Sequence, residues 1–105
     1  MNTKEDLLNR IKRAVDQVDS TAEVILYGSY ARGDYNEQSD MDLVILIDQE
    51  EITWADQKRI KYPLYDIEFE TGVIISPMVL SKKEWENKRH QTPFRENVRQ
   101  EGQVI

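Results

Sequence analysis

Two aspartates, Asp40 and Asp42, lie two residues apart at the start of a run of apolar residues. Successive side chains of a strand point to opposite faces, so we expect these two carboxylates to point the same way. Carboxylates held close together repel each other unless a cation or a proton lies between them, and Mg²⁺ or Mn²⁺ binds such ligands together with substrate phosphate oxygens. The pair therefore indicates a metal clamp, although an isolated Asp-x-Asp pair is more often only a turn residue and a strand-end residue.

A second pair, Gly28 and Ser29, follows a short β-branched run. Glycine at the end of a strand lets a ligand approach the backbone, and the next turn offers N–H groups without a partner inside a helix. These groups and the hydroxyl of Ser29 could donate hydrogen bonds to the β- and γ-phosphates of a nucleotide. A lone Gly-Ser pair is also compatible with a plain strand-to-helix turn, so the hypothesis depends on its combination with the two aspartates.

Periodic apolar residues predict the elements that position these pairs. Helical spacing predicts a first helix over 4–18, and the β-branched run predicts a strand over 23–27. Ser29 could cap a short helical turn, and a polar loop follows over 34–39. The apolar run over 42–47 predicts a central strand that is buried on both faces. Both chemical pairs therefore lie at strand ends.

The second half of the chain predicts two further helices, a strand and a short capped turn. A capping pattern indicates a helix over 53–70 that Pro63 kinks or interrupts. A strand follows over 73–80, where Pro77 indicates an edge position or a bulge. The remaining elements are a short turn capped by Ser81 and a last helix from Thr92 to Gly102.

This order, α-β-α-β-α-β-α, predicts an α/β fold with a small mixed β-sheet of three or more strands flanked by helices. The chain has 105 residues, which we interpret as one domain over 1–105. Trp54 and Trp85 are interpreted as covering its core rather than stacking on a base.

Composition excludes several classes of protein. The chain has no cysteine and a single histidine, which excludes disulfides, thiolate sites and histidine-cluster zinc sites. Its net charge of −6 disfavours binding to long nucleic acids, because affinity for nucleic acids depends on neutralising their phosphates. No apolar run is long enough for a membrane span and no secretory signal opens the chain, so we expect a cytoplasmic protein without a membrane partner.

The two chemical pairs together resemble the signature of minimal nucleotidyltransferases of the DNA polymerase β superfamily. The resemblance lies in two segments, Gly28-Ser29-Tyr30-Ala31-Arg32-Gly33-Asp34 and Ser39-Asp40-Met41-Asp42-Leu43. It implies a nucleotidyltransferase fold like the polymerase β palm and transfer of a nucleoside monophosphate from an NTP, with ATP expected, to a hydroxyl group. Two metal ions would then clamp the attacking and leaving oxygens of an in-line displacement.

The resemblance also implies roles for individual residues. Gly28, Ser29 and Ser39 would bind the nucleotide, and Asp40 and Asp42 would bind Mg²⁺ or Mn²⁺ and act in catalysis. Arg32 would either reach a phosphate or only pair with a nearby acid such as Asp34.

One expected group is missing from the pattern. The superfamily has a third carboxylate on the strand after the next helix, and here Ser76 occupies the corresponding position. Three acids just upstream could substitute if the helix ends early, although they fit a solvated helix face better; they are Asp66, Glu68 and Glu70. The missing acid puts turnover in doubt more than nucleotide binding.

Two functions are compatible with these residues. One is an enzyme that, as the resemblance implies, pairs with a small all-helical protein of the higher-eukaryote-and-prokaryote nucleotide-binding (HEPN) type and acts as an antitoxin by adding AMP to a tyrosine of that partner. The other is a catalytically weak or inactive nucleotide-binding module that neutralises a helical partner by contact. The sequence identifies neither the acceptor nor the nucleotide base.

Overall fold

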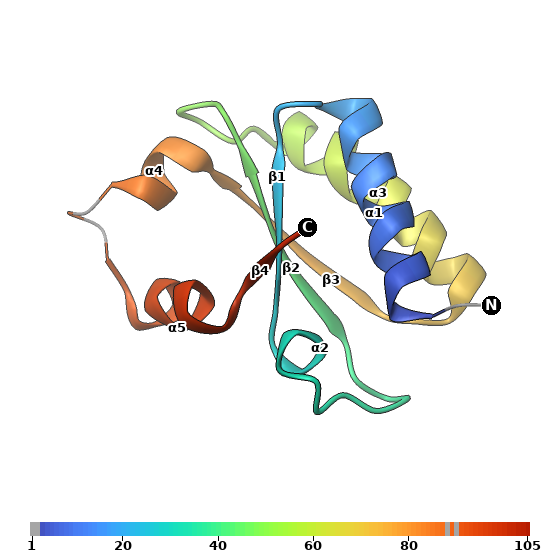
Figure 1. Cartoon of the computed structure of the whole chain (residues 1–105). Coiled ribbons are helices and arrows are strands. Elements are labelled where there is room, and N and C mark those ends of the chain that lie inside the picture. Colours follow the sequence, from blue (N-terminus) through green and yellow to red (C-terminus); the bar gives the residue numbers. More distant parts are fainter. Residues whose placement is uncertain (1–2, 88, 90) are drawn as a thin grey trace.

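The computed structural model describes residues 3–87, 89 and 91–105, which form a four-stranded sheet with helices on both faces (Figure 1). In chain order the elements are α1 (Lys4–Val18), β1 (Glu23–Tyr27), α2 (Ser29–Arg32), β2 (Met41–Ile47), α3 (Trp54–Thr71), β3 (Ile75–Ser81), α4 (Lys82–Glu86), α5 (Pro93–Glu101) and β4 (Gln103–Val104).

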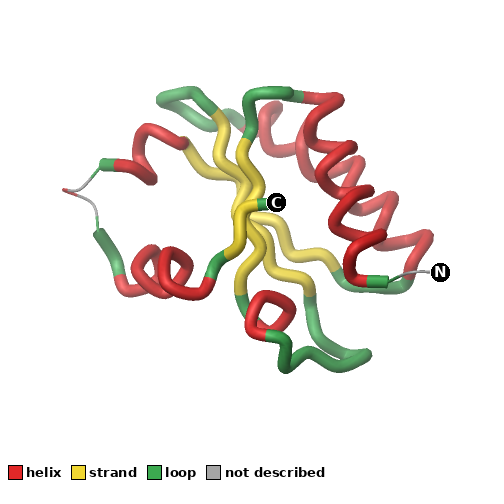
Figure 2. Tube along the Cα trace, in the orientation of Figure 1, coloured by secondary structure: helices red, strands yellow, loops and turns green. Residues whose placement is uncertain are grey.

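The sheet has the strand order β3-β2-β1-β4 and is mixed. Strand β1 is antiparallel to both β2 and β4, whereas β2 and β3 are parallel. Helices α1 and α3 lie on one side of the sheet, and α4 and α5 lie on the other (Figures 1 and 2). The α/β class and the small mixed sheet predicted from the sequence are confirmed.

The two faces of the sheet are covered unequally. The larger cluster joins alternate residues of the strands to α1 and α3, and includes Ile11, Leu43, Ile45 and Leu64. The smaller cluster on the opposite face joins Ile25, Val44 and Leu46 to Val98 of α5. Strand β2 contributes to both clusters, which confirms that it is central and buried on both faces.

Polar caps set the beginnings of the helices. Thr3 accepts a hydrogen bond from the N–H of Asp6 at the start of α1, which begins and ends where its apolar periodicity predicts. At α3, Thr53 and Asp56 form a complete capping box. The sequence predicts that Pro63 kinks or interrupts this helix, and the structure excludes an interruption because the helix runs through Pro63 to Thr71. Packing of the helix against the sheet compensates for the hydrogen bond that proline cannot donate.

Other boundaries differ modestly from the predicted ones. Strand β3 begins at Ile75 instead of 73, and its place at the sheet edge explains how it accommodates Pro77. Gly28, not Ser29, is the N-cap of α2, and Ser29 is its first helical residue. The two-residue strand β4 was not predicted. No helix in the part of the chain that the structure describes is long and apolar enough to cross a membrane.

Candidate active site

The turn between β1 and α2 is built around Gly28. Its φ of 74° and ψ of −155° lie in a region that only glycine occupies readily. A Cβ atom at this position would be 2.5 Å from Oδ2 of Asp42. The missing side chain therefore lets the backbone of the turn and the carboxylate of Asp42 lie against each other.

The N-terminus of α2 opens at the same place. The N–H groups of Ala31 and Arg32 are bonded to the carbonyl oxygen of Gly28, at 3.1 and 3.0 Å. The N–H groups of the two preceding residues, Ser29 and Tyr30, come too early in the helix for such a bond. They and the hydroxyl of Ser29 are suited to donate to phosphate oxygens.

Asp42 lies on the face of the sheet that α4 and α5 cover. It shares that face with Val44 and Leu46, because residues two apart on a strand point the same way. Partial burial and the negative charge of Asp40 both raise the pKa of Asp42, whereas the charge of Arg32 lowers it. Asp40 precedes the strand and is exposed, so the carboxylate pair has one sheltered and one open member.

This pair suits a divalent cation, because two carboxylates that disfavour each other's charge are stabilised by one positive ion. Mg²⁺ is typically held by one or two carboxylates together with substrate phosphates, so Asp40 and Asp42 are sufficient as the protein's contribution. Among residues 3–87, 89 and 91–105, no three or more His, Cys, Asp or Glu side chains form a group able to hold a metal. The chain's own residues thus fit a metal bound jointly with a nucleotide.

Ser76 lies directly beside Asp42. The parallel register of β2 and β3 pairs these two residues, so their side chains share one face. The three upstream acids lie elsewhere, since α3 covers the opposite face of the sheet. Glu68 accepts a hydrogen bond from the N–H of Ile75 at 2.7 Å, and Glu70 pairs with Arg10. Asp66 is exposed on the same helix, and none of the three replaces the missing carboxylate beside Asp42.

Arg32 and Ser39 both have partners within the protein. Arg32 donates to Asp34 and to Glu101, each at 3.3 Å, which matches the interpretation that it pairs with nearby acids. The hydroxyl of Ser39 accepts a hydrogen bond from the N–H of Asn36 at 2.9 Å and closes the loop before β2. Arg32 would have to exchange its partners to reach a phosphate.

Sequence reasoning missed Tyr27, which is paired with Asp42 across β1 and β2. Its pKa is raised by burial and by the charge of Asp42. The ring of Phe94 packs edge-on against Tyr27, with centroids 5.5 Å apart, and Trp85 packs edge-on against Phe94 in turn. The strand register places Tyr27 beside Asp42, and the packing of α4 and α5 adds the other two rings, so no local sequence pattern indicates this row.

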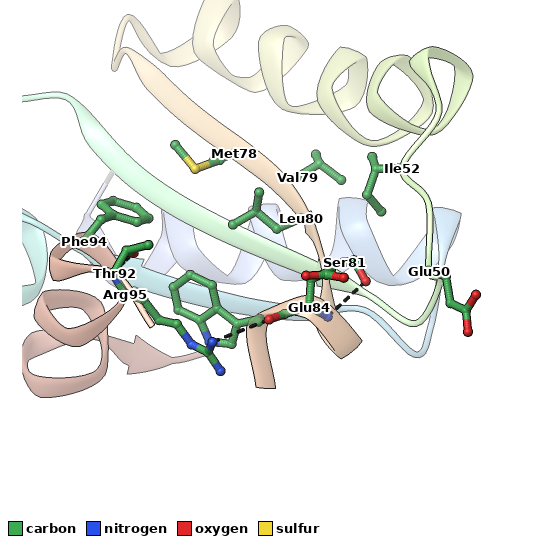
Figure 3. A pocket seen from close by; sticks show the side chains of 11 residues that line it. Glu50, Ile52, Met78, Val79, Leu80, Ser81, Glu84, Thr92, Phe94 and Arg95 are labelled. Carbon is green, nitrogen blue, oxygen red and sulfur yellow. Dashed lines mark hydrogen bonds between the residues drawn. The ribbon is translucent and has the colours of Figure 1, made fainter. Parts of the chain in front are cut away.

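The aromatic row ends at a cavity of about 480 Å³ between β3 and the α4–α5 layer. Figure 3 shows Met78 and Leu80 on the strand side and Phe94 and Arg95 on the helix side. Arg95 is buried and donates to the carbonyl oxygen of Asn87 at 2.6 Å, which ties α5 to the end of α4. The lining of the cavity is mainly apolar, with Met78, Leu80, Trp85 and Phe94 among its residues. The cavity lies on the same face of the sheet as Asp42.

Comparison with known proteins shows the family of this chain. A family model described as a nucleotidyltransferase domain matches residues 8–104. Two curated relatives from Methanocaldococcus jannaschii, both named "Putative protein adenylyltransferase", are 35% and 38% identical over 80 and 85 residues. These matches cover 73% and 78% of this chain, and 79% and 75% of the relatives' own lengths.

A solved structure of a "putative nucleotidyltransferase from Sulfolobus solfataricus" is also similar, with a TM-score of 0.48 and 26% identity over 76% of this chain and 74% of that chain. The match of the family model to nearly the whole length, together with the two curated relatives, shows that this chain belongs to the nucleotidyltransferase domain family.

Proposed function

We propose that this chain transfers AMP from ATP to a hydroxyl group of a partner protein, with Mg²⁺ or Mn²⁺ bound at Asp40 and Asp42. The observation that carries the proposal is the contact between the Gly28 turn and Asp42, where a Cβ atom would not fit. It joins a phosphate-binding turn to a carboxylate pair. Membership of the family supports nucleotidyl transfer, and the names of the two relatives support a protein as the acceptor.

In this mechanism the backbone of the turn positions the nucleotide. The early N–H groups of α2 and the hydroxyl of Ser29 donate to the β- and γ-phosphate oxygens, and the absent side chain of Gly28 leaves room for them. The metal would neutralise charge on the phosphates and polarise the P–O bond that breaks. Asp40 and Asp42 would hold that metal, whose positive charge offsets their own charges and those of the phosphates.

Ser76 changes how the acceptor loses its proton. A serine hydroxyl at this position can hold the acceptor by a hydrogen bond, but it is not a base near neutral pH. The proton must therefore leave to solvent or to a phosphate oxygen, and we expect slow turnover. General-base catalysis typically contributes about 100- to 10,000-fold in rate.

The cavity beside β3 is the proposed place for the acceptor side chain. In-line displacement puts the acceptor oxygen and the leaving pyrophosphate on opposite sides of the phosphorus. The turn that would hold the pyrophosphate follows β1, and the carboxylates lie at the start of β2, with Asp40 just before the strand and Asp42 within it. The cavity lies beyond them along β3. Its apolar walls, among them Met78 and Phe94, suit an aromatic side chain such as tyrosine.

We propose that the acceptor hydroxyl belongs to a small helical protein of the HEPN type and that this chain acts as the antitoxin of that protein. The similarity of the two segments around Gly28 and Asp42 to minimal nucleotidyltransferases supports this partner.

Mass spectrometry tests the proposal. The chain is incubated with the product of its neighbouring gene, ATP and Mg²⁺, and that protein is examined for a covalent AMP group. We expect an adduct on a tyrosine that disappears with Asp42→Asn. In the same assay Met78→Glu should raise the KM for the partner and leave the KM for ATP unchanged.

The absence of a third acid beside Asp42 favours a second candidate, a nucleotide-binding module that neutralises its partner by contact. The same incubation distinguishes the two functions. Tight binding of the partner without an adduct from any NTP would support the nucleotide-binding module and exclude nucleotidyl transfer to that partner.

A further inference from the structure

Helix α3 has apolar side chains on two opposite faces. The inner face packs on the sheet and on α1 through Ile60, Leu64 and Ile67. The outer face carries four large aromatic side chains, with exposed fractions of 69% for Trp54, 59% for Tyr62, 41% for Tyr65 and 92% for Phe69. With 3.6 residues per turn, the centres of the two sets lie about 150° apart around the helix. A surface helix normally has one apolar face, and apolar residues on both are typical of a helix that is covered on both.

The expectation that Trp54 covers the core is therefore wrong, because it belongs to this exposed aromatic stripe, which we define as Trp54, Tyr62, Tyr65 and Phe69. Its companion Trp85 does pack against the smaller core cluster. The ammonium group of Lys58 lies over the ring of Trp54, 5.5 Å from its centroid. A shallow pocket of about 140 Å³ opens between the rings of Trp54, Tyr62 and Tyr65.

Charges along α3 are divided between its two halves. The first half carries Lys58, Arg59 and Lys61, and Arg59 pairs with Asp56 of the same half. The second half carries Asp66, Glu68 and Glu70, and Glu70 pairs with Arg10 of α1. The helix midpoint lies at Tyr62, within the stripe. A second α3 helix laid antiparallel would therefore bring opposite charges together, whereas a parallel one would bring like charges together.

We propose that the exposed aromatic stripe is the interface of a two-fold symmetric dimer in which α3 packs antiparallel against α3 of a second copy of this chain. In such an interface each contact occurs twice. Rotation about Tyr62 places Lys58 of one copy opposite Asp66 of the other, and the reverse. The stripe therefore pairs apolar rings with apolar rings, and the charges beside it pair with opposite charges of the second copy.

The area of the stripe sets the strength of the dimer. Large aromatic side chains bury about 150–250 Å² each, so the exposed fractions correspond to on the order of 500 Å² per copy. A total of about 1,000 Å² is at the low end of specific interfaces, so we expect a weak dimer with a Kd of about micromolar or higher. The carboxylate pair faces the other side of the sheet, so the dimer leaves both candidate active sites open.

Sedimentation velocity over a range of protein concentrations tests the dimer. We expect the chain to shift from monomer to dimer across roughly micromolar concentrations. Tyr62→Glu and Phe69→Glu should each weaken the dimer at least tenfold, because a carboxylate would be buried between apolar rings. Tyr35→Glu, at an exposed ring outside α3, is the matched control and should leave the Kd unchanged. Circular dichroism melting of each variant separates loss of the dimer from loss of the fold.

Charge reversal tests the antiparallel arrangement. Lys58→Glu alone puts acid opposite acid, and Asp66→Lys alone puts base opposite base, so each variant should dimerise more weakly than the natural chain. A mixture of the two variants should form heterodimers with near-natural affinity, because both reciprocal contacts are then attractive. A natural chain that remains monomeric to millimolar concentration, or reversed variants that do not pair, would overturn the proposal. A monomer that instead binds its helical partner through this stripe would also overturn it.

Discussion

At the scale of single residues, the candidate site holds a carboxylate charge that a bound cation would stabilise. Asp42 is partly buried next to the charge of Asp40, and both effects raise its pKa. The backbone at Gly28 has a conformation that other residues rarely adopt. The charge of Asp42 therefore costs stability in the free protein, and carboxylates with raised pKa values are common at functional sites.

Asp42→Asn should therefore raise the melting temperature of the metal-free protein at pH 7. The folded pKa of Asp42 is raised, so its charged form opposes folding once the pH exceeds the ordinary value of 3.8, and an amide removes that cost. Differential scanning calorimetry at low salt and with a chelator measures the shift. A lower melting temperature than that of the natural chain would mean that the carboxylate stabilises the fold.

Gly28→Ala should abolish nucleotide binding and destabilise the fold by about 1–3 kcal/mol, because its φ is positive and its Cβ atom would collide with Asp42. Gly33→Ala is a matched control with a φ of 86° and no atom within 4 Å of the added Cβ. It should cost about 1–2 kcal/mol through its left-handed conformation alone. Titration calorimetry with ATP and Mg²⁺ should show binding to the Gly33 variant only. Binding by both variants would show that the turn at Gly28 does not bind the nucleotide.

Ser76→Asp should accelerate transfer at least tenfold at saturating ATP and Mg²⁺, because it places a carboxylate beside Asp42 in the register of β2 and β3. Single-turnover kinetics measures this step directly. An unchanged or slower rate in a folded variant would show that adding a carboxylate at position 76 does not speed the loss of the acceptor's proton.

At the scale of elements, the bounds of α1 and the central place of β2 could be predicted because caps and apolar periodicity act locally. The continuity of α3 through Pro63 could not, since it depends on packing of Ile60 and Leu64 against distant residues. The same packing outweighs a cost of about 3 kcal/mol for an internal proline. The strand β4 has two residues, too few for any periodic signal.

The capping box of α3 predicts a dependence of stability on pH. Asp56 accepts hydrogen bonds from the N–H and hydroxyl of Thr53, at 3.0 and 2.8 Å, and these lower its pKa. A lowered folded pKa contributes stability above the ordinary value of 3.8 that is lost as the pH falls through the folded value. Asp56→Asn should thus be less stable than the natural chain at pH 7 and approach it as the pH falls from about 5 towards 3.

Urea unfolding at several pH values measures that difference. Thr3→Ala is the control, because it removes a hydroxyl cap at α1 and should cost about 1 kcal/mol at every pH. A difference for Asp56→Asn that stays constant with pH would show that the charge of Asp56 does not stabilise the capping box.

At the scale of the whole molecule, the sheet separates two surfaces. One side carries Asp42, Ser76 and the cavity under α5, and the other carries α3 with its aromatic stripe. The sequence indicated the Gly-Ser and Asp-x-Asp pairs because each is local. It did not indicate Tyr27 beside Asp42, or the outer stripe of α3, because both depend on which face each residue occupies.

The central claim is that Gly28, Ser29, Asp40 and Asp42 transfer a nucleotidyl group. The most direct test compares ATP labelled on its α-phosphate with ATP labelled on its γ-phosphate, in the presence of Mg²⁺ and the helical partner. Nucleotidyl transfer predicts that only the α label becomes attached to protein, that pyrophosphate is released, and that both signals vanish with Asp42→Asn. Attachment of the γ label, or attachment of the α label that survives Asp42→Asn, would contradict the account.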